Sequence, residues 1–111
     1  MSESKILKGT IVQLIGHFMS GLATLVVDQE IEPGGPRVRS SVFCDNAPTV
    51  RTLDRAFGGF IGEGHTFLNE VIEGKEIYYT VDGFGILEGF TPVEEAPPEM
   101  VRIYEQQGGE L

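Results

Sequence analysis

The sequence predicts a mainly β protein of the α+β class, with about six antiparallel strands in two three-strand meanders, each followed by a short helix. Three observations support this. Runs rich in β-branched and aromatic residues recur along the chain, turns containing glycine or proline separate them, and apolar residues at helical spacing follow each set of three. Such strands could close into a barrel or form two sheets packed face to face, and we favour a small, partly closed barrel because closure removes exposed strand edges.

The first two strands are predicted over residues 6–15 and 22–28, which are apolar and rich in β-branched side chains. Ser20-Gly21 lies between them and has turn composition. These two segments are therefore expected to form a hairpin.

The strongest turn signal in the chain spans residues 32–36, where two prolines fix φ and two glycines permit positive φ. A third strand is predicted over residues 37–44. Side chains alternate across a strand, so Arg37 and Arg39 share one face, opposite the face of Val38 and Val42. The arginines are expected on the solvent side.

A helix is predicted to follow this strand. Asp45 or Asn46 can cap its N-terminus, and Pro48 suits the first turn because the N–H that proline lacks would have no intrahelical partner. The glycines at 58–59 end the helix, since glycine adopts the left-handed C-cap conformation. Its apolar stripe, at spacings of three and four, consists of Val50, Leu53 and Phe57.

The second meander is predicted from three further strand-like segments, over residues 66–72, 76–81 and 84–90. Asp82-Gly83 is a two-residue hairpin signal, because both positions can adopt the positive φ of a type I′ turn. A short terminal helix over residues 99–105 follows a pair of prolines.

Length and cysteine content place limits on the class of protein. A chain of 111 residues has the size of one domain, which we assign to residues 1–111, with flexible or lightly docked ends at about 1–5 and 107–111. Cys44 is the single cysteine, so neither an intrachain disulfide nor a multi-cysteine metal site can form. Without a recognisable signal peptide or a membrane-spanning segment, we expect a cytoplasmic location.

The charge of the chain disfavours two classes of partner. The formal net charge is −9 and the isoelectric point about 4.5, whereas nucleic-acid binding requires clustered lysine and arginine. The same acidity keeps the domain away from anionic membranes. The partners that we expect are a second copy of the chain, another protein, or a small anion.

A glycine-rich segment over residues 58–64 precedes His65 and has two interpretations. Glycines let backbone N–H groups approach a phosphate, yet this segment follows a helix and leads toward strands, unlike the known phosphate loops. Glu63 within it would also repel an anion. We favour a helix C-cap with a connecting loop and keep the anion loop as the alternative.

The two histidines and the cysteine are weak candidates for chemistry. His17 and His65 could join nearby carboxylates in a metal site or an acid–base pair, but no spacing supports this, so we predict no metal and no cofactor. Cys44 precedes a helix N-terminus that could lower its pKa, although Asp45 opposes that effect. A small buried side chain is the favoured interpretation of Cys44.

Arginine has the most specific distribution in the sequence. Four of the five arginines occupy one short stretch: Arg37, Arg39, Arg51 and Arg55. The first two share a strand face and the last two a helix face, so they could converge with His65 on one ligand or partner patch. The alternative is neutralisation of these arginines by Asp54 and by the acidic residues Glu94, Glu95 and Glu99.

Three function classes remain open from the residues alone. The first is a non-catalytic protein-interaction domain that self-associates as a homodimer, which fits the lack of a catalytic pattern. The second is a small-molecule or anion-binding barrel with its pocket near Arg39, Arg51 and His65. The third, a hydrolase-like enzyme using His65 and Glu63 as acid–base groups, ranks last, because no nucleophile or orienting residue stands at a telling spacing.

Overall fold

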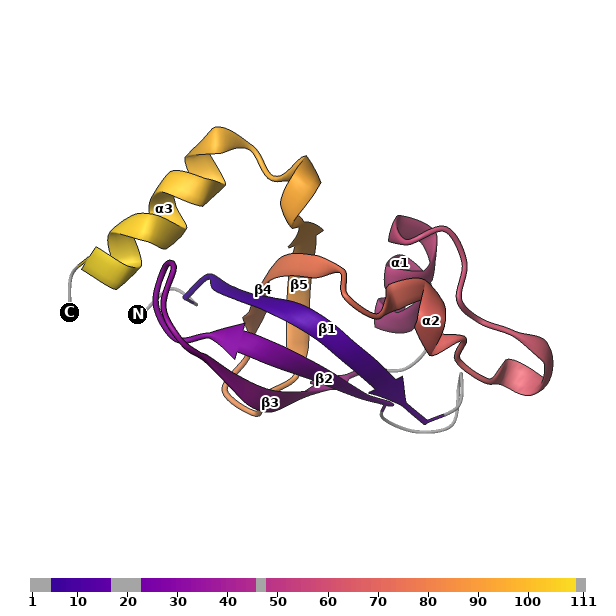
Figure 1. Ribbon diagram of the computed structural model, residues 1–111. Coiled ribbons are helices and arrows are strands. Elements are labelled where there is room, and N and C mark those ends of the chain that lie inside the picture. The colour runs from indigo at the N-terminus through magenta and orange to yellow at the C-terminus, as the bar shows by residue number, and fades with distance from the viewer. Residues whose placement is uncertain (1–4, 17–22, 46–47, 110–111) are drawn as a thin grey trace.

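The computed structural model describes residues 5–16, 23–45 and 48–109, which form one five-stranded antiparallel sheet with three α-helices (Figure 1). The strands are β1 Leu7–Ile15, β2 Ala23–Glu30, β3 Arg37–Cys44, β4 Glu76–Val81 and β5 Leu87–Pro92. The helices are α1 Pro48–Ala56, α2 Asn69–Ile72 and α3 Pro98–Gly109, with short 3-10 turns η1 Glu63–His65 and η2 Val93–Glu95. None of the described helices is long and apolar enough to cross a membrane.

The strand order across the sheet is β3-β2-β1-β4-β5, so β1 joins the two halves of the chain. It pairs antiparallel with β2 on one side and with β4 on the other. A bulge between Ile11 and Gln13 adds one residue to β1, and this shift in the alternation lets Ile11 and Leu14 lie on the same buried face although they are three positions apart. The edges of the described sheet are β3 and β5.

One face of the sheet carries the core, and α1 and α2 cover that face. Alternating residues of all five strands point into it, as the period of two in a strand requires. The buried set includes Ile11, Leu14, Leu25, Val27, Val42, Cys44, Ile77, Tyr79 and Leu87 from the strands, with Val50 and Leu53 from α1 and Ile72 from α2. We call this the core face and the opposite one the outer face.

The terminal helix α3 packs on the outer face, and Figure 1 shows it at the opposite side of the view from α1 and α2. The ring of Tyr104 from α3 meets Tyr78 of β4 edge to face, with 5.4 Å between ring centres. Gln107 also bonds the backbone of Ile6, donating from Nε2 to the carbonyl at 2.9 Å and accepting from the N–H at 3.2 Å. Tyr104 covers Tyr78 on the outer face and Tyr79 points into the core, so both tyrosines are buried although they face opposite sides of one strand.

The sheet curls until its two edges meet at one end. Phe43 near the end of β3 donates its N–H to the carbonyl oxygen of Gly85 at 3.0 Å, and Phe43 forms an isolated parallel bridge with Ile86. The described strands do not close further. The predicted barrel is therefore not confirmed, and what the structure shows is an open, curled sheet.

Most predicted elements are confirmed within the described residues, but the strand predicted over residues 66–72 is wrong. Its second half is the helix α2, and the reason is Asn69. The amide of Asn69 accepts from the N–H of Leu14 at 2.7 Å and donates to the carbonyl of Leu14 at 3.3 Å, so a side chain takes the place of a strand pairing. Five strands are described where six were predicted.

The hairpin between β4 and β5 is also wider than the two-residue turn predicted. Asp82 Oδ1 accepts from the N–H groups of Phe84 and Ile86 at 2.8 and 3.0 Å, and positive φ falls on Gly85. The strand consequently begins at Leu87 instead of residue 84. The predicted turn at Ser20-Gly21 and cap at Asn46 lie outside the described residues.

Candidate functional site

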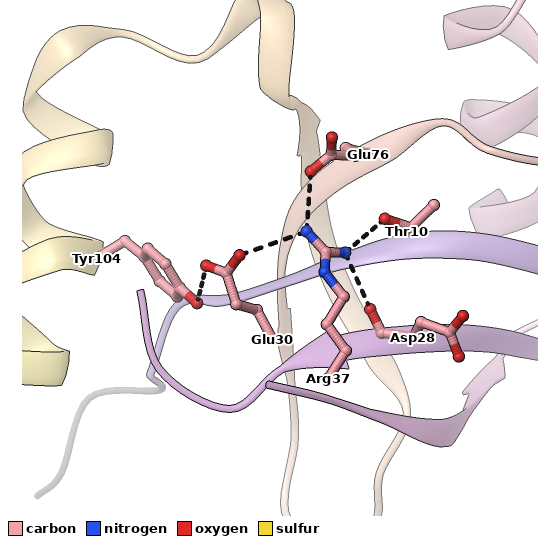
Figure 2. Close-up of polar contacts among 6 residues, drawn as sticks. All are labelled: Thr10, Asp28, Glu30, Arg37, Glu76 and Tyr104. Carbon is pink, nitrogen blue, oxygen red and sulfur yellow. Dashed lines mark hydrogen bonds and ion pairs between the residues drawn. The ribbon is translucent and has the colours of Figure 1, made fainter. Parts of the chain in front are cut away.

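The outer face carries a cluster of polar side chains around Arg37, the first residue of β3 (Figure 2). The turn before it is closed by a bond from the N–H of Ile31 to the carbonyl of Pro36 at 2.9 Å. That turn sets the register of the hairpin, in which Arg37 lies opposite Glu30 and Arg39 lies opposite Asp28. The alternation of the two strands therefore places both arginines and both carboxylates on the same face.

The guanidinium of Arg37 is held by groups from three strands. Nη1 donates to Thr10 Oγ1 at 2.6 Å and to the backbone carbonyl of Asp28 at 3.5 Å. Nη2 pairs with Glu30 Oε2 at 3.3 Å and with Glu76 Oε2 at 3.5 Å. Figure 2 shows these partners arranged around the guanidinium, which leaves its two terminal nitrogens engaged within the chain.

Glu30 is the buried charge of this cluster, with 7% of the residue exposed. Its second oxygen, Oε1, accepts a hydrogen bond of 3.0 Å from the hydroxyl of Tyr104. Burial, reinforced by this bond, raises the pKa of Tyr104 above its ordinary range. Both Glu30 oxygens thus have a donor, which is the condition for tolerating a buried carboxylate. We name Arg37, Glu30, Glu76, Thr10 and Tyr104 the Arg37 network.

The Arg37 network is suited to holding α3 and the 31–36 turn on the sheet. Lys8 adds to it, since Nζ lies 5.6 Å from the ring centre of Tyr78, the ring against which Tyr104 packs. An anion would have to displace two carboxylates from Arg37 in order to bind there. Within the described part of the chain, no group of three or more histidine, cysteine, aspartate or glutamate side chains is placed to hold a metal ion.

Arg39 lies two residues along the same strand face in a simpler setting. Its Nε and Nη2 donate to the two carboxylate oxygens of Asp28 at 3.0 and 3.3 Å, a bidentate pair. The two side chains are 65% and 35% exposed. The bond from Arg39 lowers the pKa of Asp28, and Asp28 in turn raises that of Arg39.

The structure does not bring the four clustered arginines onto one surface. Arg51 and Arg55 belong to α1, which packs on the core face through Val50 and Leu53. Arg37 and Arg39 point from the opposite face of the sheet. The side chain of His65, the fifth residue of the predicted patch, lies outside the described part, as does His17.

The carboxylates that pair with Arg37 and Arg39 were missed by reasoning from sequence, which assigned Asp54 and the acidic C-terminal residues to that role. Asp28 and Glu30 alternate on β2 as the arginines alternate on β3, and this pattern on either side of one turn was the signal. Asp54 instead accepts from the N–H groups of Phe60 and Ile61 at 2.6 and 3.1 Å.

The same contacts of Asp54 explain the glycine-rich segment. Gly58 and Gly59 have φ of +83° and +96°, the left-handed conformation expected of a helix C-cap. The backbone N–H groups that follow are bound by the Asp54 carboxylate, so an anion from within the chain already occupies this part of the loop. The segment has the structural role that we favoured.

Cys44 lies at the end of β3 on the core face and is fully buried. Desolvation raises the pKa of its thiol to about 12, which keeps the sulfur protonated near neutral pH. A thiolate nucleophile at this position is therefore disfavoured, and the residue behaves as a small apolar side chain.

The outer edge of β3 is the other feature of this region. The N–H of Phe43 points away from β2, because it bonds Gly85, so the backbone groups of Arg37, Arg39 and Ser41 point the same way. No described residue pairs with the backbone of these three positions. Val38 between them is 47% exposed. The edge thus presents donors and acceptors in a regular row.

The second edge, β5, differs in each of these respects. It has six residues, including Gly89 and Pro92, and its pairing with β4 shifts register between Thr80 and Val81. The ring of Phe57, the residue that follows α1, stacks on Phe90 with 6.1 Å between ring centres. A proline, a bulge and a covering helix are the devices that protect a strand edge from further pairing.

Comparison of this chain with protein-family models, with curated proteins and with solved structures gives no match.

Proposed function

We propose that this protein is a small, non-catalytic interaction domain that self-associates as a homodimer, with β3 of one copy pairing antiparallel with β3 of the other. The observation that carries the proposal is the outer edge of β3, an eight-residue strand in continuous register with β2, whose outward backbone groups from Arg37 to Ser41 have no partner among the described residues. Unprotected edges of this kind pair with other strands.

The charged side chains of β3 do not protect its outer edge from pairing with another strand. Charged side chains on an edge strand discourage pairing, and β3 has two arginines. Both are matched by carboxylates of their own chain, Asp28 for Arg39 and Glu30 for Arg37. The edge is therefore close to neutral along its length, and it contains no proline, glycine or bulge.

A contact of this size is expected to be weak. Each backbone hydrogen bond contributes about 1 kcal/mol net, so the about six bonds formed over three outward residues of each copy are comparable in free energy to the rigid-body freedom lost on association. We therefore expect reversible association of folded domains. Its measurement requires a wide range of protein concentrations.

The test is sedimentation equilibrium of the chain and of Ser41→Pro. Proline at Ser41 removes an N–H that points away from β2, so the pairing of β3 with β2 is kept while the row of outward donors is interrupted. We expect a concentration-dependent dimer for the unmodified chain and at least a tenfold weaker association for Ser41→Pro.

The matched control is Ser41→Ala, which removes the hydroxyl but keeps the N–H and is expected to dimerise like the unmodified chain. Val38→Lys is a second disrupting variant, since this exposed side chain tolerates lysine without loss of the fold. A chain that is monomeric at all concentrations, or one whose dimer survives both disrupting variants, contradicts the proposal.

A small-molecule-binding domain is the second candidate. A hollow of about 300 Å³ lies on the outer face of β4 and β5 beside Met100 of α3, lined also by Ile6, Tyr78 and Thr91. Its apolar walls suit an apolar ligand better than an anion. Native mass spectrometry of protein purified without denaturation would favour this candidate if it showed a retained small molecule.

We propose the cytoplasm as the place of this function. The support is the single cysteine, Cys44, which is buried and cannot form a disulfide within the chain.

A further inference from the structure

The outward backbone groups of β3 are available at three positions, and a fourth is occupied. Arg37, Arg39 and Ser41 point away from β2 with no described partner for their backbone. At Phe43 the same kind of N–H already donates to Gly85 at 3.0 Å, so the turn between β4 and β5 closes the row there. Any strand that pairs with this edge must end before Phe43.

We infer that Arg39 lies on the twofold axis of the β3–β3 dimer, so that Arg37 of each copy is opposite Ser41 of the other. This inference rests on the proposed function. When two identical strands pair antiparallel about a twofold axis, one residue lies opposite its own copy and marks the axis. The number of that residue fixes every other pair of opposing residues. With Arg39 at that position, all three outward residues of each copy pair, and about six backbone hydrogen bonds form, two for each closely spaced pair.

The two neighbouring registers use the edge less well. An axis at Ser40 would place the partner's Arg37 opposite Phe43, whose N–H is taken by Gly85. An axis at Val38 would place Ser41 opposite the partner's Gly35, which belongs to the turn before β3 and follows the positive-φ Gly34. Only the Arg39 axis pairs every available position and stops short of the closed end.

The charge at the axis is compensated within each copy. Two arginines directly opposite each other repel, which would disfavour this register if they were unpaired. Each Arg39 is held by both oxygens of its own Asp28, at 3.0 and 3.3 Å. The axis therefore brings together two arginines and two aspartates with no net charge among them.

Disulfide cross-linking distinguishes the registers. In the Arg39 register, Val38 lies opposite the partner's Ser40 as a pair without mutual hydrogen bonds, for which Cα atoms are about 4.5 Å apart, within the range that a disulfide spans. Val38→Cys and Ser40→Cys are made separately, mixed under mild oxidation at a concentration where the chain is dimeric, and analysed by intact mass. Cys44 can remain, because it is fully buried and its thiol is protonated.

We expect the mixed dimer of the two variants to form at least tenfold faster than either homodimer. Cross-linking of Ser40→Cys with itself would place the axis at Ser40, and cross-linking of Val38→Cys with itself would place it at Val38; either result overturns the inference. A dimer by sedimentation that gives no cross-link in any combination overturns it too. A chain that is monomeric by sedimentation contradicts the proposed function as well, so the two failures are distinguishable.

Discussion

Arg37 and Arg39 stand two residues apart on the same face of one strand, yet their surroundings give them different roles. Arg37 contacts a carboxylate that is 7% exposed and lies beneath α3, whereas Arg39 is 65% exposed and pairs with a single surface aspartate. The difference comes from the terminal helix, which covers the Arg37 end of the outer face and leaves the Arg39 end open. The side chains at the covered Arg37 end therefore stabilise the fold, whereas those at the uncovered Arg39 end remain accessible to a partner.

The largest expected effect on folding comes from Arg37→Met. This change removes the cation beside the buried Glu30 and leaves the carboxylate with the Tyr104 hydroxyl as its one side-chain partner in the described part of the chain. Loss of one partner of a buried pair destabilises a protein by about 3–5 kcal/mol, and because Arg37 itself is 35% exposed we expect about 1–3 kcal/mol. The measurement is urea unfolding at low protein concentration.

Arg39→Met is the matched control, since it removes the same charge from the same strand face at the open end. Its urea midpoint is expected to stay close to that of the unmodified chain, because exposed ion pairs contribute little. Equal destabilisation by the two substitutions would show that the two ends of the outer face do not differ as we describe.

A smaller effect is expected from Tyr104→Phe, which deletes the hydrogen bond from α3 to Glu30. At neutral pH the cost should be about 1 kcal/mol, measured by urea unfolding. Tyr79→Phe is the control, because the Tyr79 hydroxyl is buried without a hydrogen-bond partner in the described part of the chain and its removal should cost little.

The pH dependence of stability follows from the same tyrosine. The pKa of Tyr104 is raised in the folded state above its ordinary value of 10.0, so folding favours the neutral hydroxyl. That contribution is complete below about pH 10 and is lost as the pH rises further. The urea midpoint should therefore fall above about pH 10, and it should fall less in Tyr104→Phe. An identical alkaline loss in both would assign the effect to other groups, such as Tyr79, whose pKa burial raises to about 12.

The smallest effect on folding, but a measurable one on association, is expected from Asp28→Asn. This variant leaves the two Arg39 side chains uncompensated at the dimer axis, and we expect association to weaken several-fold in sedimentation equilibrium while the urea midpoint stays nearly constant. The loss should be larger at low salt, where repulsion between exposed charges is less screened.

Lowering the pH is expected to weaken association as Asp28→Asn does, because acid neutralises the Asp28 carboxylate. The bond from Arg39, with a smaller contribution from Arg37, lowers the pKa of Asp28 below its ordinary value of 3.8. The Asp28 carboxylate is therefore charged above about pH 4, and this charge is lost as the pH falls through the lowered pKa. Association should be constant from about pH 7 to pH 4 and weaken below that. A decrease already complete near pH 5 would have to come from another group.

The contrast between the two arginines also shows where reasoning from sequence succeeds. Alternation along residues 37–44 was enough to place Arg37 and Arg39 on the solvent side of a strand, and helical spacing was enough to place Val50 and Leu53 in the core. Both are local properties of a strand or a helix. The segment at 66–72 failed, because the bond between Asn69 and Leu14 joins residues far apart in the sequence and overrides local β propensity.

The candidate site could be predicted only in part for the same reason. Four arginines close in sequence suggested one patch, but consecutive elements can pack on opposite faces of a sheet, and α1 does so. Their true partners, Asp28 and Glu30, follow from the hairpin register, which depends on how the turn at residues 31–36 closes. The contact with Glu76 and the cover by Tyr104 could not be read from any local pattern.

The sequence by itself thus determined the α+β class, most of the strands and helices, the apolar core positions and the acidic, single-cysteine character of the chain, because each depends on residue type and short-range periodicity. The tertiary structure alone decided the strand order, the side of the sheet that each helix covers and the edge that remains unpaired. Those features arise from contacts between residues distant in the chain, such as Phe43 with Gly85 and Tyr104 with Glu30. Whether an arginine lies in a buried network or on an open edge is set by what packs over it.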